Sequence, residues 1–469
     1  MLGGFSSGLK LTDLNDFITP SQECIKPVQI PNKNKTKDKG LIEIEGSSLQ
    51  PEETYEKAKI TLNDCLACSG CITSAEVVLV NQQSLEQFSK VLNENSHLSD
   101  EDKSVIVLSV STQSVLSIAA RYNLTPQEGL EKIVGYFKSV GVDYVFDVNF
   151  ARCFSLIEAQ KEFAKRYRNS ENDSSLVFPL LASSCPGWVC YAEKTHGSFI
   201  LPYISKTRSP QQVMGSILKD YWSKKLLLKP NKLYHATLMP CFDKKLEASR
   251  EEFYNSDFDT NEVDCVITSV EVEQLFEKDG IDVNTIPCMP LDTEFSMCQT
   301  LLSHDGSGSG GFAHHVFIYA AKHLFDIEEI DLNWKTLRNN DMLELTLEVN
   351  GEKVLRFAIA NGFRNIQNLV QKIKRNKCPY HYVEIMACPS GCLNGGAQIR
   401  PNDGRTSKEL VQYLESIYKQ LPKITSQNEQ RINELYSEWL ENDDNDIQQK
   451  LYTTYKEITQ NVNPLGIKW

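Results

Sequence analysis

The chain has 469 residues, of which 41% are hydrophobic and 24% are charged, and its formal net charge is −13 at pH 7. This is the composition of a soluble globular protein that is too long for one simple core, so two to four domains or lobes are expected. The negative charge argues against a general nucleic-acid-binding protein, which would be basic.

The N-terminal segment does not have the features of a targeting sequence. Residues 1–8 lack the basic and apolar regions of a secretory signal and the Arg-rich bias of an organelle presequence. No apolar run reaches the ~20 residues needed to span a membrane. We therefore predict a cytosolic protein that also has access to the nucleus and binds no membrane. Its fourteen cysteines are expected to be thiols, because the cytosol keeps cysteines reduced.

The first motif along the chain is a run of three cysteines, each separated by two residues: Cys65, Cys68 and Cys71. Such a tight run is typical of the ligand loop of a [4Fe–4S] cluster, whereas zinc sites usually use two separated Cys-x-x-Cys pairs. No fourth cysteine follows directly, so the last ligand must come from elsewhere. Cys24 is the only other cysteine in the N-terminal part and is the natural candidate. Zinc is the main alternative at this motif.

From about residue 100, short β-rich runs alternate with helix-length segments. This alternation is typical of parallel sheets covered by helices on both faces, so we predict an α/β fold. A β-hairpin is expected around the Asn350-Gly351 turn, and a surface helix is expected near the C-terminus. The predicted strands are 105–110, 143–148, 176–182, 233–239, 263–268, 342–349, 352–360 and 383–387, and the predicted helices include 125–139, 155–167 and 312–325.

Three of these strands run into a cysteine beside a proline, and a fourth cysteine follows closely. The four residues are Cys185, Cys241, Cys388 and Cys392. In α/β proteins functional groups gather where parallel strands end. Thiolates bind soft metals, and the backbone N–H groups of a glycine-rich turn can bond to cluster sulfur. Four thiols from three strand ends predict a buried cubane site between two lobes.

Other residues of metal-ligand or phosphate-binding type have simpler explanations. The Gly-rich segment Gly306–Gly311 lacks the Lys-Ser/Thr of a nucleotide-binding loop, so close packing against a cluster, or a flexible loop, is expected. His314 and His315 after it are expected to be packing or surface residues. The isolated cysteines are expected to be small, buried, apolar residues: Cys153, Cys190, Cys265, Cys288, Cys298 and Cys378.

Several motifs resemble known protein families. The segments that resemble the active-site segments of iron-only hydrogenases are Ser184-Cys185-Pro-Gly-Trp, Ser209-Pro-Gln-Gln-Val-Met-Gly, Met239-Pro-Cys241-Phe-Asp-Lys and Ala387-Cys388-Pro-Ser-Gly-Cys392. Lys450-Leu-Tyr-Thr-Thr-Tyr resembles the small-subunit region of that family. Residues 11–27, together with the three-cysteine run, are similar to the eukaryotic cytosolic iron–sulfur assembly factors of the nuclear prelamin A recognition factor-like family.

The resemblance implies an iron-only hydrogenase-like fold with two [4Fe–4S] clusters. The N-terminal cluster would bind Cys24, Cys65, Cys68 and Cys71, and a buried cluster between two α/β lobes would bind Cys185, Cys241, Cys388 and Cys392. It also implies three parts of the chain: an N-terminal cluster-binding segment at 1–100, a two-lobed large domain at 101–425, and a helical, small-subunit-like C-terminal region at 426–469.

Members of this family act in the assembly of cytosolic and nuclear iron–sulfur proteins. The resemblance places the chain between the P-loop NTPase scaffold that builds clusters and the targeting complex, with its WD40-repeat protein, that delivers them. No direct contact with nucleic acid is expected. In that setting Trp469 would be a docking residue for the targeting complex, whereas its composition alone favours a disordered end.

Ser184 distinguishes an assembly factor from an enzyme. The hydrogenases have a cysteine at this place as a proton shuttle, and a hydroxyl has a far higher pKa than a thiol, whose usual value is ~8.5. Lys244, whose position faces the di-iron unit in the enzymes, is present. We therefore predict a cluster-binding protein without hydrogenase activity. An active iron-only hydrogenase or related oxidoreductase is the alternative, and a zinc-stabilised interaction protein is a third hypothesis.

Overall fold

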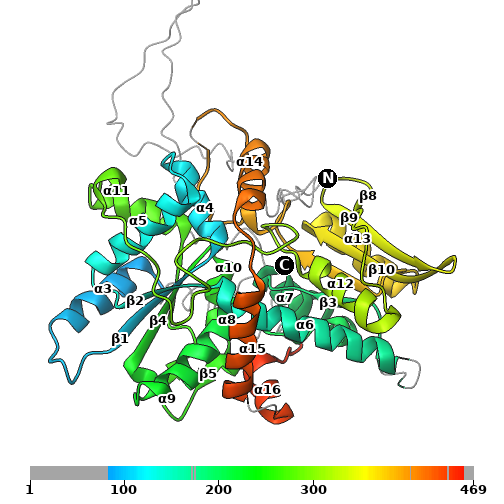
Figure 1. Ribbon diagram of the computed structural model, residues 1–469, viewed down its shortest axis with the longest axis horizontal. Coiled ribbons are helices and arrows are strands. Elements are labelled where there is room, and N and C mark those ends of the chain that lie inside the picture. Colours follow the sequence, from blue (N-terminus) through cyan, green and yellow to red (C-terminus); the bar gives the residue numbers. More distant parts are fainter. Residues whose placement is uncertain (1–82, 171–172, 174–175, 402, 441–442, 459–469) are drawn as a thin grey trace, which may run out of the picture.

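The chain folds around two β-sheets, which lie left and right in Figure 1 with helices around them. The computed structural model describes residues 83–458 except 171–172, 174–175, 402 and 441–442. The sheets have four and five strands, and β5 (Tyr254–Asn255) and β6 (Thr260–Asn261) form a small hairpin. Among the described residues, none of the helices combines the length and apolar character needed to cross a membrane.

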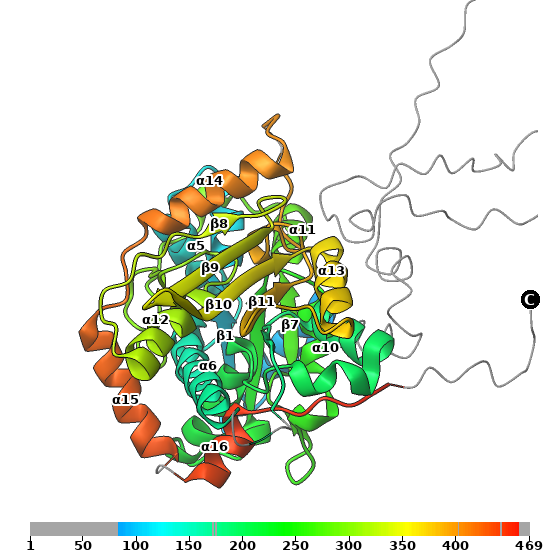
Figure 2. The same ribbon diagram turned by 90° about the vertical axis from the view of Figure 1, so that its right-hand side faces the viewer.

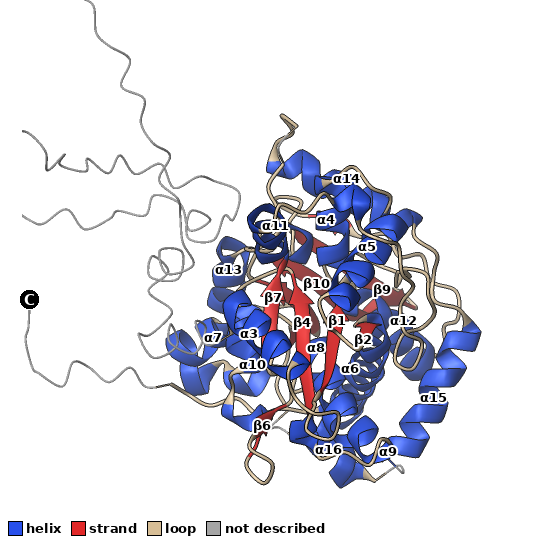
Figure 3. Ribbon diagram, turned by 90° about the vertical axis from the view of Figure 1, so that its left-hand side faces the viewer, coloured by secondary structure: helices blue, strands red, loops and turns tan. Residues whose placement is uncertain are grey.

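The first sheet has the strand order β2-β1-β4-β7, and all its neighbouring pairs are parallel. Nearly every position of its strands is buried, which agrees with their continuous apolar sequences. Helices cover both faces of this sheet, as Figure 3 shows. The strands are β1 (Val105–Val110), β2 (Tyr144–Asp147), β4 (Leu233–Met239) and β7 (Cys265–Thr268).

One face of the first sheet carries a core built from the strands and several amphipathic helices. Thr125 and Thr268 cap two of these helices, because each hydroxyl accepts the N–H three residues on and the Glu there bonds back. The helices are α3 (Leu85–Ser96), α4 (Thr112–Arg121), α5 (Pro126–Ser139), α11 (Ser269–Lys278) and α14 (Ser407–Gln420).

The second sheet has the order β3-β11-β10-β9-β8 and is mixed. Its first three strands are parallel, and β10 and β9 form an antiparallel hairpin. Asn350 and Gly351 at the turn have φ values of 53° and 83°, as a type I′ turn requires. The strands are β3 (Leu180–Ala182), β8 (Lys335–Thr336), β9 (Met342–Val349), β10 (Glu352–Asn361) and β11 (Tyr382–Met386).

Helix α6 (Asn149–Asn169) joins the cores of the two sheets. Phe150 and Phe154 near its start belong to the core over the first sheet, and Phe163 near its end belongs to the core under the second. The second sheet is also covered by α12 (Phe312–Phe325) on that face and by α7 (Pro186–Tyr191) and α13 (Phe363–Lys374) on the other.

The remaining helices surround the first sheet and the junction. The π-helical segments are η2 (Ala192–His196) and η5 (Ile217–Trp222), and the α-helices are α8 (Pro210–Ser216), α9 (Ser223–Lys225), α10 (Asp243–Ala248), α15 (Ser426–Leu440) and α16 (Asp444–Leu451). In Figure 2 the chain after α16, drawn in red, crosses the lower side of the molecule toward α10.

The predicted α/β fold is confirmed, and several element boundaries match closely. The expected strand at 176–182 is shorter, because only Leu180–Ala182 pairs with β11. The predicted C-terminal surface helix is α15, whose apolar residues Ile432, Leu435 and Trp439 are buried in the core over the first sheet. The expectation that Cys288 is buried is wrong. It is exposed, because it lies in a loop beyond the 3-10 turn Val283–Thr285.

Candidate metal centre

Two of the predicted ligands lie at the same edge of the second sheet. β3 and β11 are parallel neighbours, with Leu180 opposite Tyr382 and Ala182 opposite Glu384. Their chains leave the sheet in the same direction, so Cys185 and Cys388 follow at one end. Cys185 is the residue before α7, where Pro186 occupies the first helical position. Each cysteine follows its strand within a few residues, so the parallel pairing of β3 with β11 places the two thiols at the same edge of the sheet.

The structure brings the thiols of Cys185, Cys241, Cys388 and Cys392 into electrostatic range of one another. Burial raises the pKa of Cys241 well above its usual value, and the other three thiols raise it further. Burial likewise raises the pKa of Cys388 well above its usual value, and it raises the pKa of Cys392 to about 12. Ionising four clustered thiols requires a cationic partner, because like charges in a buried site repel.

Backbone N–H groups point at these sulfur atoms. Ala387 donates to Cys185 Sγ at 3.4 Å, and the N–H of Trp188 also bonds to this sulfur and lowers its pKa, against the larger opposing effect of burial. The N–H of Gly396 bonds to the sulfur of Cys388. Such donors stabilise thiolates and cluster sulfur. The donor set therefore fits an iron–sulfur cluster, both in its four thiols and in the amides around them.

The turn that carries Cys388 and Cys392 is braced from outside. Ser309 Oγ donates to the carbonyl of Ser390 at 2.7 Å and accepts the N–H of Leu393 at 3.0 Å. Gly391 has a φ of 74°, and a Cβ there would lie 2.5 Å from Ser309 Cβ. Only glycine satisfies both the backbone conformation and the close contact. The sequence predicted the cysteines here but not the role of Ser309.

The same turn connects the two sheets. Ala397 donates to the carbonyl of Pro240 at 3.0 Å, and its own carbonyl accepts the N–H of Val270 at 3.1 Å. A Cβ on Gly395 would lie 2.3 Å from the Pro240 carbonyl oxygen. These contacts hold the strand end that carries Cys241, on the first sheet, against the turn that carries Cys392, on the second.

The Gly-rich segment packs against β11. A Cβ on Gly310 would lie 2.2 Å from Met386 Cε, and the Glu384 carboxylate accepts the N–H groups of Phe312 and Ala313 at 3.2 and 2.9 Å. Glu384 thus caps α12 from inside the core. The segment is closely packed, as one of the two interpretations expected, but its contacts here are with β11, and packing against a cluster stays a prediction. His315 is a packing residue, with its ring against His304 and His314.

Comparison with known proteins identifies the family. The family described as the iron-only hydrogenase large subunit, C-terminal domain, matches residues 104–396. A cytosolic Fe-S cluster assembly factor from Xenopus tropicalis is 51% identical over 100% of both chains, and cytosolic iron-sulfur assembly component 3 from Mus musculus is 50% identical over the same share. The chain belongs to this family of hydrogenase-like cytosolic iron–sulfur cluster assembly factors.

Solved structures of hydrogenases share the fold of this assembly-factor family. An apo [FeFe]-hydrogenase from Chlamydomonas reinhardtii superposes with a TM-score of 0.68 at 23% identity, over 80% of this chain and 99% of the hydrogenase. A variant of the same algal enzyme gives a TM-score of 0.67 at 24% identity, over 79% and 98% of the two chains. The predicted hydrogenase-like fold is confirmed.

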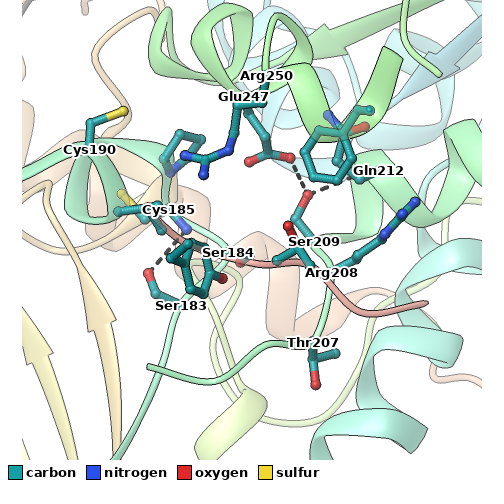
Figure 4. A pocket seen from close by; sticks show the side chains of 15 residues that line it. Ser183, Ser184, Cys185, Cys190, Thr207, Arg208, Ser209, Gln212, Glu247 and Arg250 are labelled. Carbon is teal, nitrogen blue, oxygen red and sulfur yellow. Dashed lines mark hydrogen bonds between the residues drawn. The ribbon is translucent and has the colours of Figure 1, made fainter. Parts of the chain in front are cut away.

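A small cavity lies beside Cys185 (Figure 4). Its volume is about 40 Å³, and its wall includes Ser183, Ser184 and Gln212. Ser183 Oγ donates to the carbonyl of Ile385 at 2.6 Å and accepts the N–H of Cys185 at 3.1 Å, which fixes the start of α7. Ser184 thus lies beside a predicted ligand and faces a cavity, where the hydrogenases carry a thiol.

Lys244 and Asp243 occupy the start of α10, just after Cys241. Lys244 Nζ pairs with the buried carboxylate of Glu247 at 2.8 Å, so its charge is neutralised within the helix. Burial raises the pKa of Asp243 to about 6, and Lys244 opposes this shift. The Asp243 charge raises the pKa of Cys241 as well, after the larger effect of burial.

The other predicted site residues have different outcomes. Cys24, Cys65, Cys68, Cys71 and Trp469 lie outside the described residues. Within the described part of the chain, no three His, Cys, Asp or Glu side chains are grouped as they would be around a single metal ion. Of the isolated cysteines, Cys265 is buried as expected, and Cys153, Cys190, Cys298 and Cys378 are half-buried.

Proposed function

We propose that the protein is a component of the cytosolic iron–sulfur protein assembly machinery. It binds two [4Fe–4S] clusters and links the scaffold that builds clusters to the complex that delivers them to extramitochondrial proteins. The grouping of four thiols from two different sheets carries this proposal. Relatives that match over the full chain, at about half identity, bear the name of assembly factors.

The inner cluster is assigned to Cys185, Cys241, Cys388 and Cys392. These thiols are costly to ionise alone, so a cluster supplies the positive charge that the thiolates need. The N–H groups of Trp188, Ala387 and Gly396 orient the sulfur ligands. The outer cluster is assigned to Cys24, Cys65, Cys68 and Cys71 from their spacing and the family resemblance. At both sites we therefore propose a [4Fe–4S] cluster and not the zinc ion of the alternative hypothesis.

We infer from Ser184 that the protein lacks hydrogenase activity. A catalytic proton shuttle must change protonation near neutral pH, and a serine hydroxyl does not. Lys244 is paired with Glu247, so its ammonium group already has a partner within α10. An active iron-only hydrogenase is the alternative function, supported by the fold that the chain shares with such enzymes.

Metal analysis and infrared spectroscopy of anaerobically purified protein test these assignments. Iron and sulfide in equal amounts, at about eight of each per chain, are expected for two cubane clusters. Zinc without sulfide would instead support the interaction-protein hypothesis. Infrared bands of iron-bound CO and cyanide, together with hydrogen evolution from a reduced dye, would establish the alternative enzyme.

The partners are proposed to be the P-loop NTPase scaffold and the targeting complex with its WD40-repeat protein, in the cytosol and the nucleus. Trp469 is proposed to dock on the targeting complex, because a terminal aromatic residue with a free carboxylate suits capture in a pocket. An anaerobic pull-down with the wild type and a Trp469-deleted chain tests this contact. Loss of the WD40 partner in the deletion alone is expected, while equal capture of both chains would rule out docking by Trp469.

A further inference from the structure

The segment after α16 forms a strap across the cavity beside Cys185. The C-terminal strap, residues 452–458, is held mainly through its backbone: Thr453 donates to the carbonyl of Lys206 at 2.8 Å. Just before it, the carbonyl of Leu451 accepts the N–H of Arg208 at 2.9 Å. Arg208 also donates from Nε to the carbonyl of Tyr452 at 2.9 Å. The strap is therefore attached along its length and not by a single side chain.

Glu193 anchors the far end of the strap. Its carboxylate accepts the N–H of Lys456 at 3.1 Å, and its carbonyl accepts the N–H of Ile458 at 3.2 Å. Glu193 is only 2% exposed and forms a two-pronged ion pair with Arg250, at 2.8 and 2.9 Å. Burying a carboxylate costs free energy unless hydrogen bonds and an ion pair satisfy its oxygens. The backbone N–H of the strap is one of the groups that satisfy Glu193, so the anchor depends on it.

Two strap residues, Thr453 and Tyr455, line the cavity together with Ser184 and Cys185. Tyr455 Oη donates to the carbonyl of Ser205 at 3.1 Å, which holds the side chain in place. The strap and the predicted cluster ligand therefore form walls of the same space.

Gln212 is a buried polar side chain in the wall of this cavity. Its side chain is fully buried and lines the cavity, and neither of its amide atoms has a hydrogen-bond partner among the described residues. A buried polar group without a partner is costly, and such groups are usually paired with ordered water. A space of about 40 Å³ holds about three or four waters, since one water needs about 10–15 Å³ by this measure.

We propose that this cavity binds water and other small hydrogen-bonding molecules through Gln212, and that the C-terminal strap controls their access to the Cys185 side of the inner cluster. The inference rests on the proposed function, since it treats Cys185 as a cluster ligand. With the strap in place, access to the Cys185 side is narrow, and when the strap lifts, small ligands reach it more readily from the cavity.

Cys190 reports on access without requiring the cluster. It lines the same cavity, and burial raises the pKa of its thiol to about 12, so it reacts slowly while the strap is in place. The measurement is the anaerobic rate of iodoacetamide labelling at Cys190, resolved by peptide mass spectrometry. A second measurement is the rate at which an iron chelator removes iron from the inner cluster of loaded protein.

The variant Lys456→Pro removes the N–H that Glu193 accepts, and Lys456→Ala is its matched control because it keeps that N–H. Lys456→Pro is expected to increase both rates about fivefold. This factor corresponds to the loss of one hydrogen bond with a net contribution of about 1 kcal/mol. Tyr455→Ala is expected to act in the same direction by opening the wall. Lys456→Ala is expected to match the wild type.

Equal Cys190 labelling in the wild type, Lys456→Pro and Tyr455→Ala would overturn the role of the strap. Gln212→Met, which keeps the side-chain length and removes both polar atoms, is expected to slow labelling severalfold, and an unchanged rate would overturn the role of Gln212. If the wild type holds no inner-cluster iron, the proposed function fails, while the labelling comparison still tests the strap.

Discussion

The two sheets contribute unequally to the candidate metal centre. The second sheet carries Cys185 and Cys388 just beyond the ends of two parallel neighbours, and Cys392 follows in a turn that Ser309 braces. The first sheet, fully parallel and buried, contributes only Cys241 after β4. The fourth thiol therefore depends on the junction between sheets, where Ala397 bonds to Pro240. Strand pairing within one sheet brings Cys185 and Cys388 together, and contacts between the two sheets add Cys241.

The largest expected effect is the loss of a ligand from either sheet. Cys241→Ala and Cys388→Ala should each lower bound iron to about half, because a cubane cluster needs all four thiolates. Iron and sulfide analysis of anaerobically reconstituted protein measures this. Cys265→Ala is the matched control, since Cys265 is buried on β7 but lies away from the four thiols. Full iron content in Cys241→Ala would mean that the first sheet supplies no ligand.

The first sheet should also make the protein sensitive to acid through His235. This side chain is fully buried between Ser109 and the carbonyl of Glu262, and burial lowers its pKa to about 3. In the unfolded chain the pKa is near ~6.5, so the stability that neutral His235 contributes is present above pH 6.5 and is lost as the pH falls toward 3. Between pH 6.5 and 4.5 the loss should reach about 2–3 kcal/mol.

Urea unfolding of wild type and His235→Gln at these two pH values measures the effect. Glutamine keeps one donor and one acceptor and has no titrating group. The variant should therefore lose less stability on acidification than the wild type. The same decrease in both proteins would show that His235 does not cause the acid sensitivity.

The junction between the sheets should be sensitive to a single methyl group. Gly395→Ala places a Cβ against the Pro240 carbonyl, and relieving this overlap should cost about 1–3 kcal/mol and reduce the iron content of the inner site. Gly404→Ala is the control, because nothing lies within 4 Å of a Cβ there and its φ of 83° adds only backbone strain. Iron loss in Gly404→Ala as large as in Gly395→Ala would contradict the role of the junction.

The smallest expected effect concerns a helix that covers the first sheet. Thr125→Ala removes the hydroxyl that caps α5 and should lower the free energy of unfolding by about 1 kcal/mol. Thr125→Ser keeps the cap and should remain close to the wild type. Iron content should not change in either variant, because the cap lies away from the junction. A change in iron would show that the covering helices also shape the site.

The sequence by itself determined the strands, the hairpin turn and the cysteines at the strand ends. These features are local: each β-rich run spans a few residues, Asn350-Gly351 favours one turn, and each cysteine follows its strand within a few positions. The family resemblance rests on the same short segments. For that reason the fold and four candidate ligands of the inner site could be predicted from the residues alone.

Only the tertiary structure decided how these pieces meet. Ser309 braces Ser390 across 81 residues, Ala397 joins Pro240 across the two sheets, and the strap reaches Glu193 from the other end of the chain. Such contacts depend on where whole elements pack, which the pattern of a single segment does not specify. The exposure of Cys288 and the unpaired amide of Gln212 have the same origin, because burial is set by neighbours that are distant in sequence.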